Sequence, residues 1–134
     1  MEKLIKKLVR RYGTSNPYTL ANELNIDIYF MPLGKVRGFY NNGYRRKAIY
    51  INNELPPHQQ RFTAAHELGH ALLHPRENTP FLRESTLFSV SKLETQANRF
   101  ACMLLTYHLE QSDIALSVLA ARAGIDEKVL ARYL

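Results

Sequence analysis

The sequence predicts an α+β fold, in which a sheet of about three mostly antiparallel strands packs on one helix and the remainder is helical. Three observations support this class. The N-terminal residues have helical periodicity, residues 26–52 contain runs rich in β-branched and aromatic residues, and helical periodicity returns in most of the chain after residue 56. A chain of 134 residues with 46% hydrophobic content has the size of one domain. We therefore expect residues 1–134 to form a single domain.

The N-terminal part is expected to form two helices. In the first, apolar side chains recur on one side and basic side chains on the other, and the helix ends near Gly13. A second, short helix starts at Pro17, where a missing backbone N–H costs nothing, and Ser15 or Asn16 can cap it.

Three strands are expected next. Ile26–Met31 is rich in β-branched and aromatic residues and is followed by Pro32. Residues 38–40 and 47–52 flank residues 41–46, whose Asn-Gly pair is typical of a hairpin turn. We expect the strand over residues 47–52 to be an exposed sheet edge, to which an extended peptide could add, and to pack on the helix that follows.

The helix that starts at Pro56 and Pro57 carries the most informative pattern. His66, Glu67 and His70 form the pattern H-E-x-x-H. On a helix, positions i and i+4 lie about 40° apart, so both imidazoles can reach one divalent cation. Two neutral imidazoles are typical Zn²⁺ ligands, and the glutamate can act as a general base rather than a ligand. The pattern therefore predicts a metal site with a base beside it.

A third protein ligand has to come from elsewhere, because a peptidase zinc usually has three protein ligands and a water. Glu94 is the best placed candidate, since a rigid helix is expected from near Lys92 to Tyr107 or His108. Asn98 lies one turn beyond Glu94 and could orient an imidazole by a hydrogen bond. Without the upstream pattern, the simplest role for Glu94 would be a favourable interaction of its carboxylate with the positive N-terminal end of the helix dipole. The other candidate ligands are His58, His74, His108, Glu77 and Glu84.

Two further segments lie on either side of this helix in the sequence. Residues 75–91 are rich in polar residues and are expected to form either a lid-like segment or an ordinary surface loop. Residues 112–134 are expected to form a helix pair, capped by Ser112 or Asp113 and by Asp126. The pair faintly resembles a helix-turn-helix, although such pairs usually complete a core.

Two blocks, His66–His74 and Glu94–Ala101, resemble the ImmA/IrrE family of metallo-endopeptidases. The resemblance also takes in Asn16-Pro17-Tyr18, the hairpin and Arg61-Phe62-Thr63, and it covers roughly residues 12–105. It implies a small zincin-like domain. It also implies that His66 and His70 are metal ligands, that Glu67 is catalytic and that Glu94 is the third ligand. Family members commonly continue with Leu-Leu-Met-Pro, whereas this chain has Leu104-Leu105-Thr106-Tyr107.

The resemblance further implies a regulatory protease. ImmA-like members, encoded in phages and integrative elements, cut a helix-turn-helix repressor, and IrrE-like members cut a stress regulator. The implied cofactor is one divalent metal, Zn²⁺ or alternatively Mn²⁺. Groups that could contact the substrate or the oxyanion are Tyr107, His108, Tyr50, Tyr40, Tyr44 and His74, although for each of them taken singly a structural role is favoured over a catalytic one.

Two residues near the predicted site are expected to be structural. His74 lies on the face of His66, but Pro75 ends the helix there, so we expect capping or support of a ligand rather than ligation. Cys102 is expected to be a packed, reduced thiol.

Composition limits the functional classes. The single cysteine excludes an internal disulfide, and we expect a cytoplasmic protein without membrane association, because neither a signal-like apolar region nor a long apolar run is present. The net charge of +6 is moderate, so a protein partner is favoured over direct nucleic-acid binding. The alternative to an enzyme is a non-catalytic binding module that sequesters a repressor or binds DNA.

Overall fold

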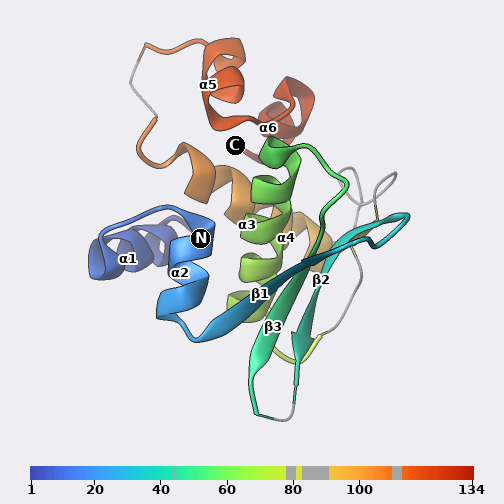
Figure 1. Cartoon of the computed structure of the whole chain (residues 1–134). Coiled ribbons are helices and arrows are strands. Elements are labelled where there is room, and N and C mark those ends of the chain that lie inside the picture. Colours follow the sequence, from blue (N-terminus) through green and yellow to red (C-terminus); the bar gives the residue numbers. More distant parts are fainter. Residues whose placement is uncertain (44, 78–80, 83–90, 110–112) are drawn as a thin grey trace.

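The computed structural model describes all residues except 44, 78–80, 83–90 and 110–112, and its α+β architecture confirms the predicted fold class (Figure 1). The described residues form helices and strands in the following order along the chain: α1 (Glu2–Tyr12), α2 (Pro17–Glu23), β1 (Ile26–Met31), β2 (Val36–Asn42), β3 (Lys47–Asn52), α3 (Pro57–Leu73), β4 (Phe81–Leu82), α4 (Lys92–Thr106), α5 (Leu116–Ala123) and α6 (Glu127–Tyr133).

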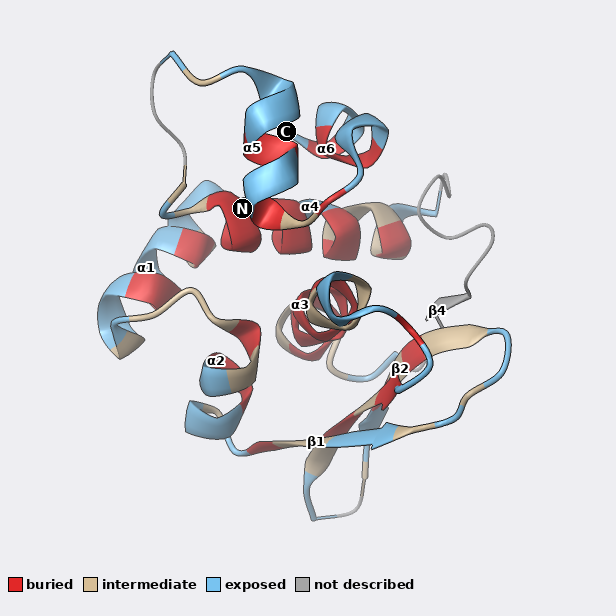
Figure 2. Cartoon of the chain, turned by 45° about the horizontal axis from the view of Figure 1, so that its top comes forward, coloured by how far each residue is buried: buried red, intermediate tan, exposed pale blue. Residues whose placement is uncertain are grey.

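The strands form one mixed sheet with the order β1-β3-β2-β4. β3 runs parallel to β1 and antiparallel to β2, and β4 pairs antiparallel with β2. Helices α3 and α4 are stacked on one side of this sheet (Figure 2). The mostly antiparallel three-stranded sheet expected from the sequence is therefore present, with one parallel pairing and the short β4 added.

The expectation that residues 47–52 form an exposed edge is wrong. β3 pairs with β1 from Ile26↔Lys47 to Met31↔Asn52 and with β2 on its other side, so its backbone groups are already used. The reason lies in its side chains. Ile49 and Ile51 are fully buried and Ala48 is nearly so, and burial on both faces is typical of an interior strand.

Helix α3 runs through the centre of the molecule. Every residue from Phe62 to Ala71 is buried, so this helix packs on all sides, against the sheet and against α4. Gly69 allows the close approach of α4, because a Cβ atom at this position would lie only 3.0 Å from Cδ1 of Phe100. The glycine of the H-E-L-G-H segment thus determines how near the two metal-site helices can come.

Local signals account for most helix ends. The Asn16 side chain accepts a hydrogen bond from the Tyr18 amide, and the Asp126 side chain accepts one from the Lys128 amide, both at 2.9 Å. α5 begins later than expected, at Leu116, and has no side-chain cap. Its buried residues begin at Leu119, the fourth residue of the helix, so tertiary packing rather than a cap stabilises it. Asp113 therefore does not cap it, and Ser112 lies outside the described residues.

No helix in the described parts of the chain is both long and apolar enough to span a bilayer.

Candidate metal centre

Three metal-ligating side chains meet between α3 and α4. His70 Nε2 lies 2.7 Å from Glu94 Oε1, and His66 Nε2 lies 3.3 Å from Glu94 Oε2. One ligand atom from each of these three residues can be chosen so that all lie within 4.8 Å of one another. All three side chains are almost completely buried. This donor set, two imidazoles and one carboxylate, is the one found in several catalytic zinc sites.

The helices place these residues by simple geometry. His66 and His70 are one turn apart on α3, and Glu94 lies in the first turn of α4, which the Gly69–Phe100 contact brings against α3. The site is therefore built on two rigid, packed helices rather than on loops.

Asn98 orients the first imidazole. Its Oδ1 atom lies 2.7 Å from His66 Nδ1, and its amide nitrogen donates to the Tyr133 hydroxyl at 3.2 Å. A carboxamide oxygen can only accept, so Nδ1 of His66 carries the proton and the Nε2 lone pair points toward Glu94. Burial lowers the pKa of His66, with further lowering by His70 and opposing contributions from Glu94 and Asn98, which keeps the ring neutral.

His74 and Gln96 orient the second imidazole. His74 Nε2 lies 2.6 Å from Gln96 Oε1, and His74 Nδ1 lies 3.1 Å from His70 Nδ1. Because the Gln96 oxygen accepts, His74 donates from Nε2 and accepts at Nδ1. His70 then donates from Nδ1, which leaves its Nε2 lone pair facing Glu94. Both ligand histidines are thus held in the tautomer that binds metal through Nε2.

The polar atoms of the site fit a cation. Both carboxylate oxygens of Glu67 and the Oε2 atom of Glu94 are buried without a hydrogen-bond partner among the described residues. Two buried carboxylates and two imidazole lone pairs in one space repel one another unless positive charge lies among them. A divalent cation with a bound water supplies that charge and a donor for Glu67, so the residues present fit the group.

The two carboxylates titrate differently. Burial raises the pKa of Glu67 well above its usual value, and the charge of Glu94 raises it further. Burial also opposes ionisation of Glu94, but its interactions with His66 and His70 outweigh burial and lower its pKa to about 2. Glu94 is therefore the ionised carboxylate of the cluster, and Glu67, whose Oε2 atom lies 3.7 Å from His66 Nε2, is the group suited to exchange a proton.

The other predicted contact residues lie away from the metal ligands. Tyr50 is on the sheet face opposite α3, where its ring stacks on Phe39 and Tyr29, because strand neighbours alternate between faces. Tyr107 and His108 follow the end of α4, about 20 Å along the helix from Glu94. The structure brings none of these three side chains to the centre.

The remaining candidates are also accounted for. Tyr40 is buried, and its hydroxyl donates to the Pro75 carbonyl at 3.0 Å, so it anchors the chain after α3. His58 lies two turns before His66, at the start of α3. Glu77 follows α3 and is not part of the ligand cluster. Tyr44 and Glu84 lie outside the described residues.

Sequence reasoning missed two residues of this network, Gln96 and Tyr133. Gln96 follows Glu94 by two positions, and its spacing to His74 depends on how α4 crosses α3. Tyr133 is near the C-terminus, and nothing local marks it as a neighbour of Asn98.

Comparison with known proteins agrees with this geometry. The chain is 49% identical over 102 residues to immunity region protein 2 of Bacillus phage phi105, covering 75% of this chain and 65% of that protein. It is 35% identical over 103 residues to Metallopeptidase ImmA of Bacillus subtilis (strain 168), covering 75% of this chain and 60% of that protein. It is 38% identical over 74 residues to Radiation response metalloprotease IrrE of Deinococcus deserti, covering 52% and 26% respectively.

The matched region contains the whole metal centre. The chain spans 65% and 60% of the first two relatives, so each of them is longer than the part matched here. The family model described as Peptidase_M78, IrrE N-terminal-like domain, matches residues 21–133, which include α3, α4 and Tyr133. The chain therefore belongs to the Peptidase_M78 family, whose model is described as the IrrE N-terminal-like domain.

Proposed function

We propose that residues 1–134 act as one metallopeptidase domain that cleaves a protein substrate with the help of one Zn²⁺ ion. The observation that carries this proposal is the convergence of His66, His70 and Glu94 beside the buried carboxylate of Glu67. A pure binding module needs no general base next to three ligands. The names of the relatives, a metallopeptidase and a metalloprotease, support the same reading.

Each side chain has a distinct role in this proposal. The bound cation supplies Lewis acidity, which acidifies a water and polarises the peptide carbonyl. Glu67 accepts a proton from the attacking water as its oxygen bonds to the carbonyl carbon. It then donates that proton to the leaving amine as the C–N bond breaks. Asn98 and His74 keep the two ligand imidazoles in the required tautomer.

We propose a helix-turn-helix repressor encoded near this gene as the substrate, and the cytoplasm as the site of action. The phage relative is named for an immunity region, which supports a phage or integrative-element context. Cleavage of such a repressor would release the genes of the element. Zn²⁺ is favoured over Mn²⁺ because two imidazoles and one carboxylate are a set typical of zinc.

The test compares parent protein with Glu67→Gln on the neighbouring repressor, after loading with Zn²⁺. We expect Glu67→Gln to retain one equivalent of metal and to lose at least about 10²-fold in cleavage rate, because general base catalysis is lost while the ligands remain. Glu23→Gln, an exposed carboxylate on α2, is the matched control and should cleave like the parent. Equal cleavage by Glu67→Gln and parent would falsify the proposed mechanism.

A second measurement compares the metal content of two variants. Glu94→Ala should lose bound metal, whereas Glu67→Gln should not, and equilibration with equal Zn²⁺ and Mn²⁺ identifies the preferred ion. Repressor or DNA binding that is sensitive to salt, survives both substitutions and yields no peptide product would instead favour a non-catalytic binding module.

A further inference from the structure

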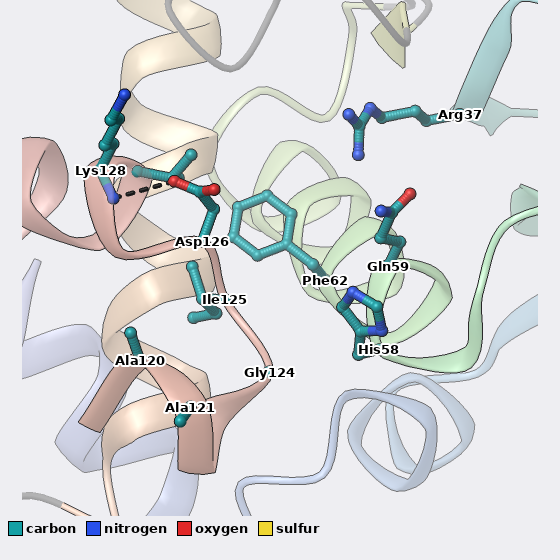
Figure 3. Close-up of a pocket in the computed structure, with 11 residues that line it drawn as sticks. Arg37, His58, Gln59, Phe62, Ala120, Ala121, Gly124, Ile125, Asp126 and Lys128 are labelled. Atoms are coloured by element: carbon teal, nitrogen blue, oxygen red, sulfur yellow. Dashed lines mark hydrogen bonds between the residues drawn. The ribbon is translucent and has the colours of Figure 1, made fainter. Parts of the chain in front are cut away.

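A second feature of the molecule is a cavity of about 760 Å³ near the metal centre (Figure 3). It lies between the start of α3, Arg37 of β2 and the corner that joins α5 to α6. None of the metal ligands lines it. Its size suits one or two amino-acid side chains of a polypeptide.

The floor of the cavity is apolar. The ring of Phe62 lies at its centre, and Ile125 and Val129 contribute from the α5–α6 corner and α6 (Figure 3). Ala121 lines it from α5 and is exposed to solvent. Such a floor favours an apolar side chain, whose transfer from water is driven by the hydrophobic effect.

The rim of the cavity carries two basic side chains, Arg37 and Lys128, and one acidic side chain, Asp126. The Arg37 guanidinium reaches in from β2, and the Asp126 carboxylate faces it from the start of α6 (Figure 3). Gln59 adds an amide from the first turn of α3, on the side of Arg37 (Figure 3). Lys128 stands beside Asp126, so the rim is basic on balance and is complementary to a ligand that places an acidic group near Arg37.

Two walls of the cavity, the α5–α6 corner and the start of α3, are in direct contact with each other. Gly124 has a φ of +70°, and a Cβ atom there would lie 3.0 Å from Cβ of His58. The α5–α6 corner therefore rests on the first turn of α3. The cavity is a formed part of the fold rather than an opening between loosely joined parts.

The cavity is connected to the metal centre through two helices. Phe62 precedes His66 by one turn of α3, about 6 Å along the helix axis. α6, which Asp126 caps, carries the Tyr133 hydroxyl that receives the Asn98 amide hydrogen bond. An extended polypeptide advances about 3.3 Å per residue, so two or three residues span the distance along α3 from His66 to Phe62.

We propose that this cavity binds the substrate polypeptide a few residues from the cleaved bond. It accepts an apolar side chain on Phe62, with an acidic residue toward Arg37. This inference rests on the proposed peptidase function, since it assigns a specificity site to the same reaction. Charge complementarity and closeness to the ligand helix favour a polypeptide as the occupant.

The experiment uses a synthetic library of random dodecapeptides in two measurements. Cleavage by the Zn²⁺-loaded parent gives residue preferences around the cut bond by mass spectrometry. Retention on immobilised, Zn²⁺-loaded Glu67→Gln gives preferences for binding without cleavage. Each measurement is repeated with Arg37→Glu, which reverses one rim charge, and with Ala121→Trp, which fills the cavity from an exposed position.

Matched controls separate this site from general surface effects. Lys3→Glu makes the same charge change on α1, and Ser117→Trp places a tryptophan elsewhere on α5. All variants should keep one equivalent of metal and the parental circular dichroism spectrum.

We expect both measurements to select an apolar residue with an acidic residue nearby. Arg37→Glu should reduce the acidic preference about two- to fivefold and leave the apolar preference in place. Ala121→Trp should reduce the apolar preference about tenfold or more. The two controls should change neither preference.

The results that would contradict the cavity assignment differ from those that would contradict the proposed peptidase function. If the parent cuts no peptide and no repressor, the peptidase function fails, and retention on Glu67→Gln still reports on the cavity. If retained peptides lack the paired preference, or if Arg37→Glu and Ala121→Trp leave it unchanged, the cavity is not a specificity site. Preferences that shift equally in Ser117→Trp and Ala121→Trp would also overturn the assignment.

Discussion

The Asn98 amide nitrogen donates a hydrogen bond to the Tyr133 hydroxyl at 3.2 Å, which links the last helix of the chain to the metal centre. The same carboxamide accepts from His66, so Asn98 joins the Tyr133 hydroxyl to the imidazole. A residue near the C-terminus thereby helps to orient a metal ligand on α3.

Tyr133→Phe removes this hydroxyl and keeps the ring. We expect the affinity for Zn²⁺ to fall about fivefold, because one hydrogen bond that orients Asn98 is lost. Competition with a chromophoric chelator measures the change. Tyr12→Phe, a partly buried tyrosine on α1, serves as control. Unchanged affinity in Tyr133→Phe would mean that packing alone orients Asn98.

His74→Phe breaks the chain of hydrogen bonds from Gln96 to His70. We expect Zn²⁺ affinity to fall about ten- to hundredfold, because His70 loses the acceptor that fixes its tautomer. Gln96→Leu should give part of the same loss. His108→Phe, an exposed histidine beyond α4, should bind metal like the parent. If His74→Phe matched that control, His70 would need no such partner.

Gly69→Ala introduces a methyl group into the α3–α4 contact. We expect a loss of about 1–3 kcal/mol in the free energy of unfolding, measured in urea, because the new Cβ meets the Phe100 ring at 3.0 Å. Trimming the ring should relieve the clash. The loss caused by Gly69→Ala should therefore be smaller in a Phe100→Ala background, which lacks Cγ and Cδ1 of the ring, and equal losses in both backgrounds would rule out this contact as the cause.

Cys102 should be chemically inert in the folded protein. Burial raises the pKa of its thiol to about 12, so the reactive thiolate is scarce at pH 8 and reagents cannot reach it. Labelling with iodoacetamide should be slow in buffer and fast in urea, and the native rate should rise with pH toward that value. Rapid native labelling at pH 8 would show that the α4 core opens readily.

Elements with local signals were predictable from the sequence. The Asn16 and Asp126 side chains cap the helices that follow them. The H-E-x-x-H spacing places its two histidines on one face of any helix. Glu94 followed from the need for a third ligand on a rigid element. These inferences require only a few neighbouring residues, so they do not depend on the path of the whole chain.

Features that depend on tertiary arrangement were not predictable. The position of β3 between β1 and β2 is determined by pairing between distant residues. Tyr107 and His108 were plausible contacts only if α4 were short or bent, and Tyr50 only if its face of the strand turned toward α3. Gln96 and Tyr133 could be recognised only once the crossing of α3, α4 and α6 was known.

The interior position of β3 also determines the order in which the sheet can assemble. β2 and β3 pair across a short turn, from Asn42↔Lys47, whereas β1 pairs with β3 only across the whole of β2. Closing the longer loop costs more chain entropy, so the hairpin forms first and β1 joins it later. By the same reasoning β1 should detach first, and its amides should exchange with solvent earliest, while the α3–α4 contact that carries the metal ligands stays closed.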